Sequence, residues 1–147
     1  MPGVICPIRG GPSSQPTIKR AISLAKEKNL ALHFLLVVNL DFLTYTESSR
    51  VRLITEEMHE MGEFILLAAQ EVASAEGIAA EAAVRQGDVG EEIIGLAQEL
   101  GADFIVMGRP LGEQDEDVFA NNRLEQFIER IESESGAKVI LEDEVDG

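Results

Sequence analysis

Short apolar runs alternate with longer segments of helical period along the chain, and this alternation constrains the fold most. The runs cover residues 4–8, 31–40, 78–85, 104–107 and 138–141, and most are continuously apolar. Continuous apolar strands are expected where both faces of a parallel sheet are covered. With right-handed crossovers, the resulting βαβαβαβαβ pattern predicts an α/β fold: a doubly wound, Rossmann-like sheet of five parallel strands with helices on both faces.

The segments between the runs contain two apolar stripes at spacings of three and four, which are the helix faces expected to pack on the sheet. The members of the stripes are Ile18, Ala21, Ile22 and Ala25, and then Ile54, Met58, Met61, Ile65, Ala68 and Val72. Met58 and Met61 are interpreted as core or dimer packing.

Residue types that favour helix ends agree with these segments. Asp88 with Glu91, and Asn122 with Glu125, have the spacing of a capping box at a helix start. Glycines fall just past three predicted helix ends, at Gly77, Gly101 and Gly136.

Composition limits the classes of protein. With 147 residues, 45% hydrophobic side chains and no linker-like stretch, the chain is predicted to form one domain over residues 1–147, with its core in 4–141 and an acidic tail at 142–147. The net charge of −15 disfavours binding to nucleic acid or anionic membranes. No apolar stretch is long enough to span a bilayer, no export signal is seen, and the single cysteine, Cys6, is expected in the core; these features predict a cytoplasmic protein.

Three stretches carry a resemblance to a known family. They are "VICPIRGGPSSQPTIKRAISLAKEKNLALHFLLVV", "VRQGDVGEEIIGLAQELGADFIVMGRP" and "GAKVILE", and together they resemble the universal stress protein family. The resemblance implies the strand order 3-2-1-4-5 and frequent homodimers. It also implies, in one branch of the family, an adenine nucleotide across the ends of strands 1 and 4. The apolar last strand, residues 138–141, is the edge at which a homodimer is predicted.

The nucleotide-binding branch has an Asp at the end of strand 1, where this chain has Arg9 followed by Gly10. A guanidinium only donates hydrogen bonds, so Arg9 cannot accept one from an adenine amino group. Gly10 and Gly11 are open to two interpretations, a loop that approaches a ligand or a tight strand-to-helix turn.

After strand 4 the branch has the signature Gly-x-x-Gly-(x)9-Gly-(Ser/Thr), whose glycines and hydroxyl hold phosphate. Gly108 matches, but the second glycine position falls on Leu111, with Gly112 one residue late. Asn121 and Asn122 stand at the last pair. Because Asn tolerates a left-handed backbone and caps helices, the turn is expected to persist without the hydroxyl.

Four carboxylates follow this turn, on Glu113, Asp115, Glu116 and Asp117. Near a triphosphate they would repel the ligand, because like charges about 4 Å apart cost roughly 4 kcal/mol near a protein surface. Mg²⁺ could reverse the effect by binding carboxylate and phosphate oxygens together. A solvated acidic surface is the simpler interpretation. We also expect Arg9 to pair with a carboxylate or carbonyl of this loop.

These observations predict a non-enzymatic stress-response or regulatory module with a degenerate nucleotide site, no cofactor and no metal. No set of nucleophile, base and orienting group can be assembled, and neither His33 nor His59 has ligands at metal-binding spacing. The alternative is a universal stress protein that binds ATP or AMP, with Mg²⁺. It would use the backbone near Val38 for adenine, and for the phosphates Gly108, Arg109, Gly112, Asn121 and Asn122.

Overall fold

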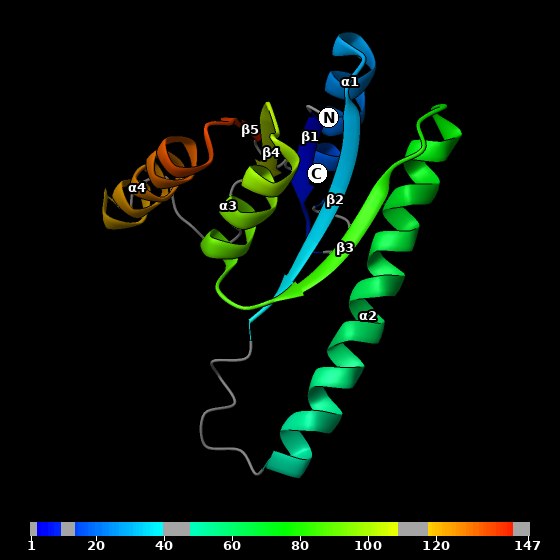
Figure 1. Cartoon of the computed structure of the whole chain (residues 1–147), viewed down its shortest axis with the longest axis vertical. Helices are drawn as coiled ribbons and strands as arrows, with labels where there is room; N and C mark the ends of the chain where they lie inside the picture. The colour runs from blue at the N-terminus through cyan, green and yellow to red at the C-terminus, as the bar shows by residue number, and fades with distance from the viewer. Residues whose placement is uncertain (1–2, 10–13, 40–47, 109–117, 143–147) are drawn as a thin grey trace.

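The computed structural model describes residues 3–9, 14–39, 48–108 and 118–142 (Figure 1). Strands and helices alternate strictly in this part of the chain. In order they are β1 (Gly3–Pro7), α1 (Gln15–Lys28), β2 (Ala31–Val38), α2 (Ser48–Ala75), β3 (Glu81–Gln86), α3 (Val89–Leu100), β4 (Phe104–Gly108), α4 (Val118–Ser135) and β5 (Lys138–Glu142).

The strands form one parallel sheet in the order β3-β2-β1-β4-β5, which confirms the predicted fold class and strand order. In the central strand, Val4 lies opposite Leu32 of β2 and Phe104 of β4. The winding reverses between β1 and β4, because β2 and β3 extend the sheet to one side of β1 while β4 and β5 extend it to the other.

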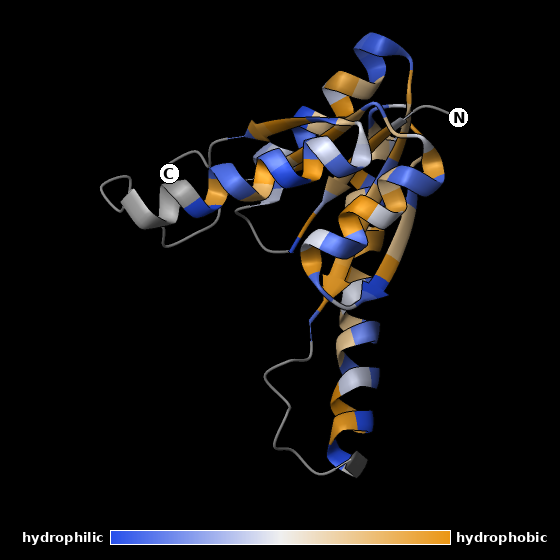
Figure 2. Cartoon of the chain, turned by 60° about the vertical axis from the view of Figure 1, so that its left-hand side comes forward, coloured by the Kyte–Doolittle hydropathy of each residue, from blue (hydrophilic) through white to orange (hydrophobic). Residues whose placement is uncertain are grey.

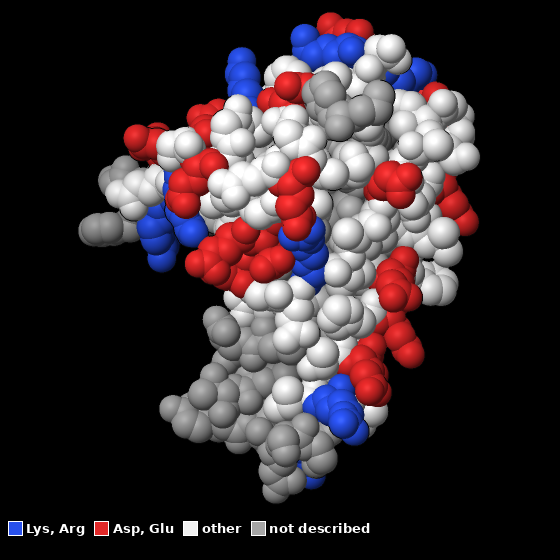
Figure 3. All heavy atoms as spheres, viewed as in Figure 1, with Lys and Arg blue, Asp and Glu red and all other residues white. Residues whose placement is uncertain are grey.

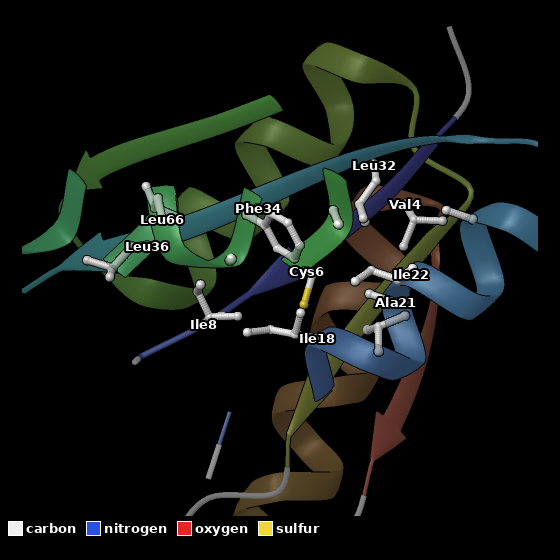
Figure 4. Close-up of a cluster of buried hydrophobic side chains, with 14 of the residues drawn as sticks. Val4, Cys6, Ile8, Ile18, Ala21, Ile22, Leu32, Phe34, Leu36 and Leu66 are labelled. Atoms are coloured by element: carbon white, nitrogen blue, oxygen red, sulfur yellow. The ribbon is translucent and has the colours of Figure 1, made fainter. Parts of the chain in front are cut away.

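The helices cover both faces of the sheet and bury a separate apolar cluster under each face. One cluster lies under α1 and α2 and is centred on Phe34, with Cys6, Ile18 and Leu66 around it (Figure 4). The other lies under α3 and α4 and contains Ile5, Leu35, Ile93, Ile105 and Ile131. Successive strand residues alternate between the two clusters, which is why the strands are apolar on both faces.

The helix ends largely follow the predicted signals. The Asp88 carboxylate accepts a hydrogen bond from the backbone N–H of Glu91 at 3.0 Å, so Asp88 is the N-cap of α3. Gly77, Gly101 and Gly136 follow helix ends with positive φ, as glycine readily does. Two strand boundaries were wrong by more than one residue. β2 ends at Val38 and not at Leu40. β3 begins at Glu81 and not at Ile78, whose N–H instead donates to the carbonyl of Ala73 at the end of α2.

The predicted inward face of α2 is confirmed in part. Met58, Ile65 and Val72 pack against the apolar cluster centred on Phe34. Met61 is 62% exposed and Ala68 is also exposed, whereas Leu66, Ala69 and Ala73 are buried. A side chain at Gly62 would come within 3.1 Å of Leu36 and 3.3 Å of Val84, so α2 approaches the sheet at this glycine. The helix is apolar on more than one side, so periodicity predicted part of the inward face but also included two exposed positions.

Candidate functional site

The winding of the sheet places a candidate site at the carboxyl ends of β1 and β4. These strands are neighbours, and the helices that follow them lie on opposite faces of the sheet. In doubly wound folds this arrangement leaves a crevice in which ligands bind. Arg9 follows β1, and Gly108 is the last residue of β4, so the fold brings the ends of these two predicted site segments to one edge.

Gly108 lies against the first turn of α1. A Cβ at this position would be 2.8 Å from the Thr17 hydroxyl oxygen, closer than side chains pack, and Thr17 is only 3% exposed. Close packing therefore accounts for the glycine without any ligand. Sequence reasoning missed Thr17, because it precedes the apolar stripe of α1 and no motif marks it as a neighbour of Gly108.

Arg9 is exposed just beyond β1. The chain is held there by the N–H of Ile8, which donates to the carbonyl of Leu35 at 2.8 Å. The partner predicted for Arg9, a carboxylate or carbonyl of residues 113–117, lies outside the described residues. That pairing therefore stays a prediction.

Val38 ends β2 and is buried. Its carbonyl accepts a hydrogen bond from the N–H of Gly87, which follows β3, at 2.9 Å. An adenine contact at this carbonyl would have to share an oxygen that the sheet already uses. Three other predicted contacts, Gly10, Arg109 and Gly112, lie outside the described residues.

The turn predicted at Asn121 and Asn122 is wrong, because α4 begins at Val118 and contains both residues. Neither has a left-handed backbone; among the described residues other than glycine, only Asn29 has a positive φ. Backbone amides beyond the first turn of a helix are paired within it, so Asn122 offers no free N–H to a phosphate. The capping-box spacing therefore predicted the wrong helix start. Asn inside a helix lowers the stability of the helix by less than about 1 kcal/mol relative to Ala, so the helix can continue through both residues.

Burial shifts the pKa of two groups on the described strands, Cys6 and His33. Cys6 is fully buried in β1 as predicted, and its thiol contacts the Thr17 carbonyl at 4.0 Å. Burial raises the pKa of the Cys6 thiol, which keeps it neutral and weakly nucleophilic. His33 lies toward the amino end of β2, opposite Glu81. Partial burial lowers the pKa of His33, and the Glu81 carboxylate partly opposes this shift.

The described part of the chain contains neither a metal-binding group of side chains nor a membrane-spanning helix. No three His, Cys, Asp or Glu side chains in that part of the chain are grouped closely enough to hold a metal ion. No helix within it is long and apolar enough to cross a bilayer. The acidic stretch at 113–117 lies outside the described residues.

The arrangement is that of a small, doubly wound α/β domain whose winding reverses between β1 and β4. The sequence profile of the universal stress protein family matches residues 3–112, and the chain belongs to this family. No curated protein sequence matches the chain.

Solved structures of the family share the fold at low sequence identity. One is a universal stress protein family member from Burkholderia pseudomallei, with 21% identity, 95% of each chain covered and a TM-score of 0.70. A universal stress protein in complex with cAMP has 21% identity over 98% of each chain, at a TM-score of 0.71. A third, from Archaeoglobus fulgidus in complex with dAMP, has 14% identity over 96% of this chain and 97% of the other, at a TM-score of 0.60. At these identities the likeness concerns the fold alone.

Proposed function

We propose that this universal stress protein is a non-enzymatic, cytoplasmic stress-response or regulatory module whose nucleotide site is degenerate. The observation that carries the proposal is Arg9, exposed directly after β1, where the nucleotide-binding branch has an Asp. The cation cannot accept a hydrogen bond from the adenine amino group. The loss is not compensated at α4, where the backbone of Asn122 lies inside a helix.

The proposal is tested by mass spectrometry of the small molecules released when the purified protein is denatured. A degenerate site should release no adenine nucleotide in amounts comparable to the protein. A relative with an intact Asp and Gly-x-x-Gly signature, purified in parallel, controls for loss of nucleotide during purification. Release of ATP or AMP at near one molecule per chain would overturn the proposal.

The alternative function is an ATP- or AMP-binding module that requires Mg²⁺. It is favoured by the fold shared with relatives in complex with cAMP and dAMP. In this chain Gly108 keeps its place at the end of β4, and Arg109 and Gly112 follow it in the sequence. The test is the same measurement after loading the protein with ATP and Mg²⁺. A metal-dependent signal that vanishes in the double variant Asp115→Asn/Asp117→Asn would assign the acidic stretch as the metal ligand.

Homodimer formation through β5 is part of the proposal. β5 lies at the end of the sheet and pairs only with β4 among the described strands. Its outer edge is partly protected, because the Glu132 carboxylate accepts a hydrogen bond from the N–H of Val139 at 2.9 Å. Strand residues alternate their hydrogen-bonding direction, so the backbone of Leu141 also faces the outer edge. A partner strand would therefore pair around Leu141 or displace Glu132.

Light scattering of variants tests this interface. Ile140→Lys should shift the mass toward the monomer, whereas Val89→Lys, at an exposed position on α3, should not. Glu132→Ala exposes the Val139 N–H and should strengthen self-association. An unchanged mass for Ile140→Lys would reject β5 as the interface.

A further inference from the structure

Large apolar side chains are exposed along α2. Leu53 is 56% exposed, Met61 62%, Phe64 77% and Leu67 52%. Elsewhere in the described part of the chain, the one other large apolar residue that is exposed is Val89 on α3, at 39%. Single exposed apolar residues are ordinary on a protein surface, but a group on one helix is not.

The four side chains share one face of the helix. At about 100° per residue, positions 53, 61, 64 and 67 fall within a sector of roughly 120°. Gly62, Leu66, Ala69 and Ala73 turn toward the sheet, so this sector points away from it. We call the four residues the outer face of α2. Figure 2 shows hydrophobic bands along the helix, including the half that extends beyond the strand ends.

Acidic side chains lie among and beside the apolar side chains of the outer face. The glutamates of α2 are all exposed: Glu56, Glu57, Glu60, Glu63 and Glu71. Lys and Arg are absent between residues 53 and 75, and the two arginines of the helix, Arg50 and Arg52, precede Leu53. Figure 3 shows acidic side chains spread along α2. Because five glutamates outnumber two arginines on α2, a second copy of this chain would bring mostly like charges together, which disfavours self-association at this face. The charge instead complements a basic partner.

We propose that the outer face of α2 is a docking surface for a basic amphipathic helix of another protein. The partner would place apolar side chains at helical spacing on Phe64 and its neighbours and direct Lys or Arg toward the glutamates that lie between and beside them. The face runs from residue 53 to 67, which is about 21 Å or four turns of helix, so the matching segment needs a similar length. This inference is independent of whether the crevice binds nucleotide.

Fluorescence anisotropy with a designed probe tests the proposal on the full-length protein. The probe is a labelled 18-residue helical peptide of leucine and lysine, with leucine on one face. We expect it to bind, and we expect the double variant Phe64→Ser/Leu67→Ser to weaken binding by about tenfold to a hundredfold, as loss of buried apolar area requires. Val89→Ser removes an exposed apolar side chain on α3 and should leave the affinity unchanged. Circular dichroism checks that each variant is folded.

Further variants separate this docking from simple charge attraction. An identical peptide with glutamate in place of lysine should not bind, and Glu60→Lys/Glu63→Lys should weaken binding of the lysine peptide most at low salt. Undetectable binding to the unaltered protein, or equal binding to the Phe64→Ser/Leu67→Ser variant, would overturn the proposal. A lower mass for Phe64→Ser than for the unaltered protein in light scattering would also overturn the proposal, because a second copy would then occupy the face.

Discussion

Substitution of Gly108 by Ala tests the packing at the candidate crevice. The added Cβ would lie 2.8 Å from the Thr17 hydroxyl oxygen, while the next nearest atom, the Thr17 Cβ, is at 4.0 Å. The conflict therefore concerns one oxygen atom of one buried residue. Overpacking of a buried site costs about 1–3 kcal/mol, and we expect Gly108→Ala to lower the free energy of unfolding by that amount.

The test is a double-mutant cycle measured by urea unfolding. Thr17→Ala removes the oxygen, so Gly108→Ala in that background should cost less than about 0.5 kcal/mol, and the coupling between the two sites should approach the whole effect. Gly95→Ala is the matched control. It lies inside α3, its nearest neighbour would be Arg85 at 3.7 Å, and it should stabilise the protein by about 0.5–1 kcal/mol. Equal costs of Gly108→Ala with and without Thr17 would refute the reasoning.

The remaining predictions concern a cap, the core and pH. Asp88→Ala removes the N-cap of α3 and should cost about 1 kcal/mol, seen as a fall in Tm of roughly 2–4 °C. Ile93 is fully buried, and Ile93→Ala should lower the free energy of unfolding by about 2–5 kcal/mol in urea titrations. The folded state lowers the pKa of His33 below its ordinary value of 6.5, so this residue should destabilise the fold as pH falls below 6.5. His33→Gln should reduce the stability lost between about pH 7 and 5.5; an unchanged loss would contradict this account.

The fold was predictable because its signals are local and repeated. The continuous apolar strands, the Asp88 cap and the glycines after the helices each depend on neighbouring residues, and the structure confirms them. The strand order came from the family resemblance, and it too is confirmed. Local pattern gave only part of the inward face of α2, because a Cβ at Gly62 would meet Leu36 and Val84 on distant strands, and the sequence pattern does not show this close approach.

The candidate site was less predictable for the same reason. Counting along the family motif placed Asn121 and Asn122 in a turn. The structure instead places both residues inside α4, which begins at Val118. The packing of Thr17 against Gly108 joins residues that are remote in sequence, and no spacing rule connects them. Arg9 was identified as a departure from the family pattern, and its predicted partner in residues 113–117 lies outside the described residues.

Titration calorimetry with ATP, with and without Mg²⁺, tests the central claim most directly. A degenerate site predicts no binding tighter than about millimolar in either condition, which corresponds to a binding free energy of about −4 kcal/mol. Arg9→Asp alone should not create binding, because it also adds negative charge to a protein of net charge −15. A micromolar dissociation constant for the unaltered protein, in either condition, would contradict the account.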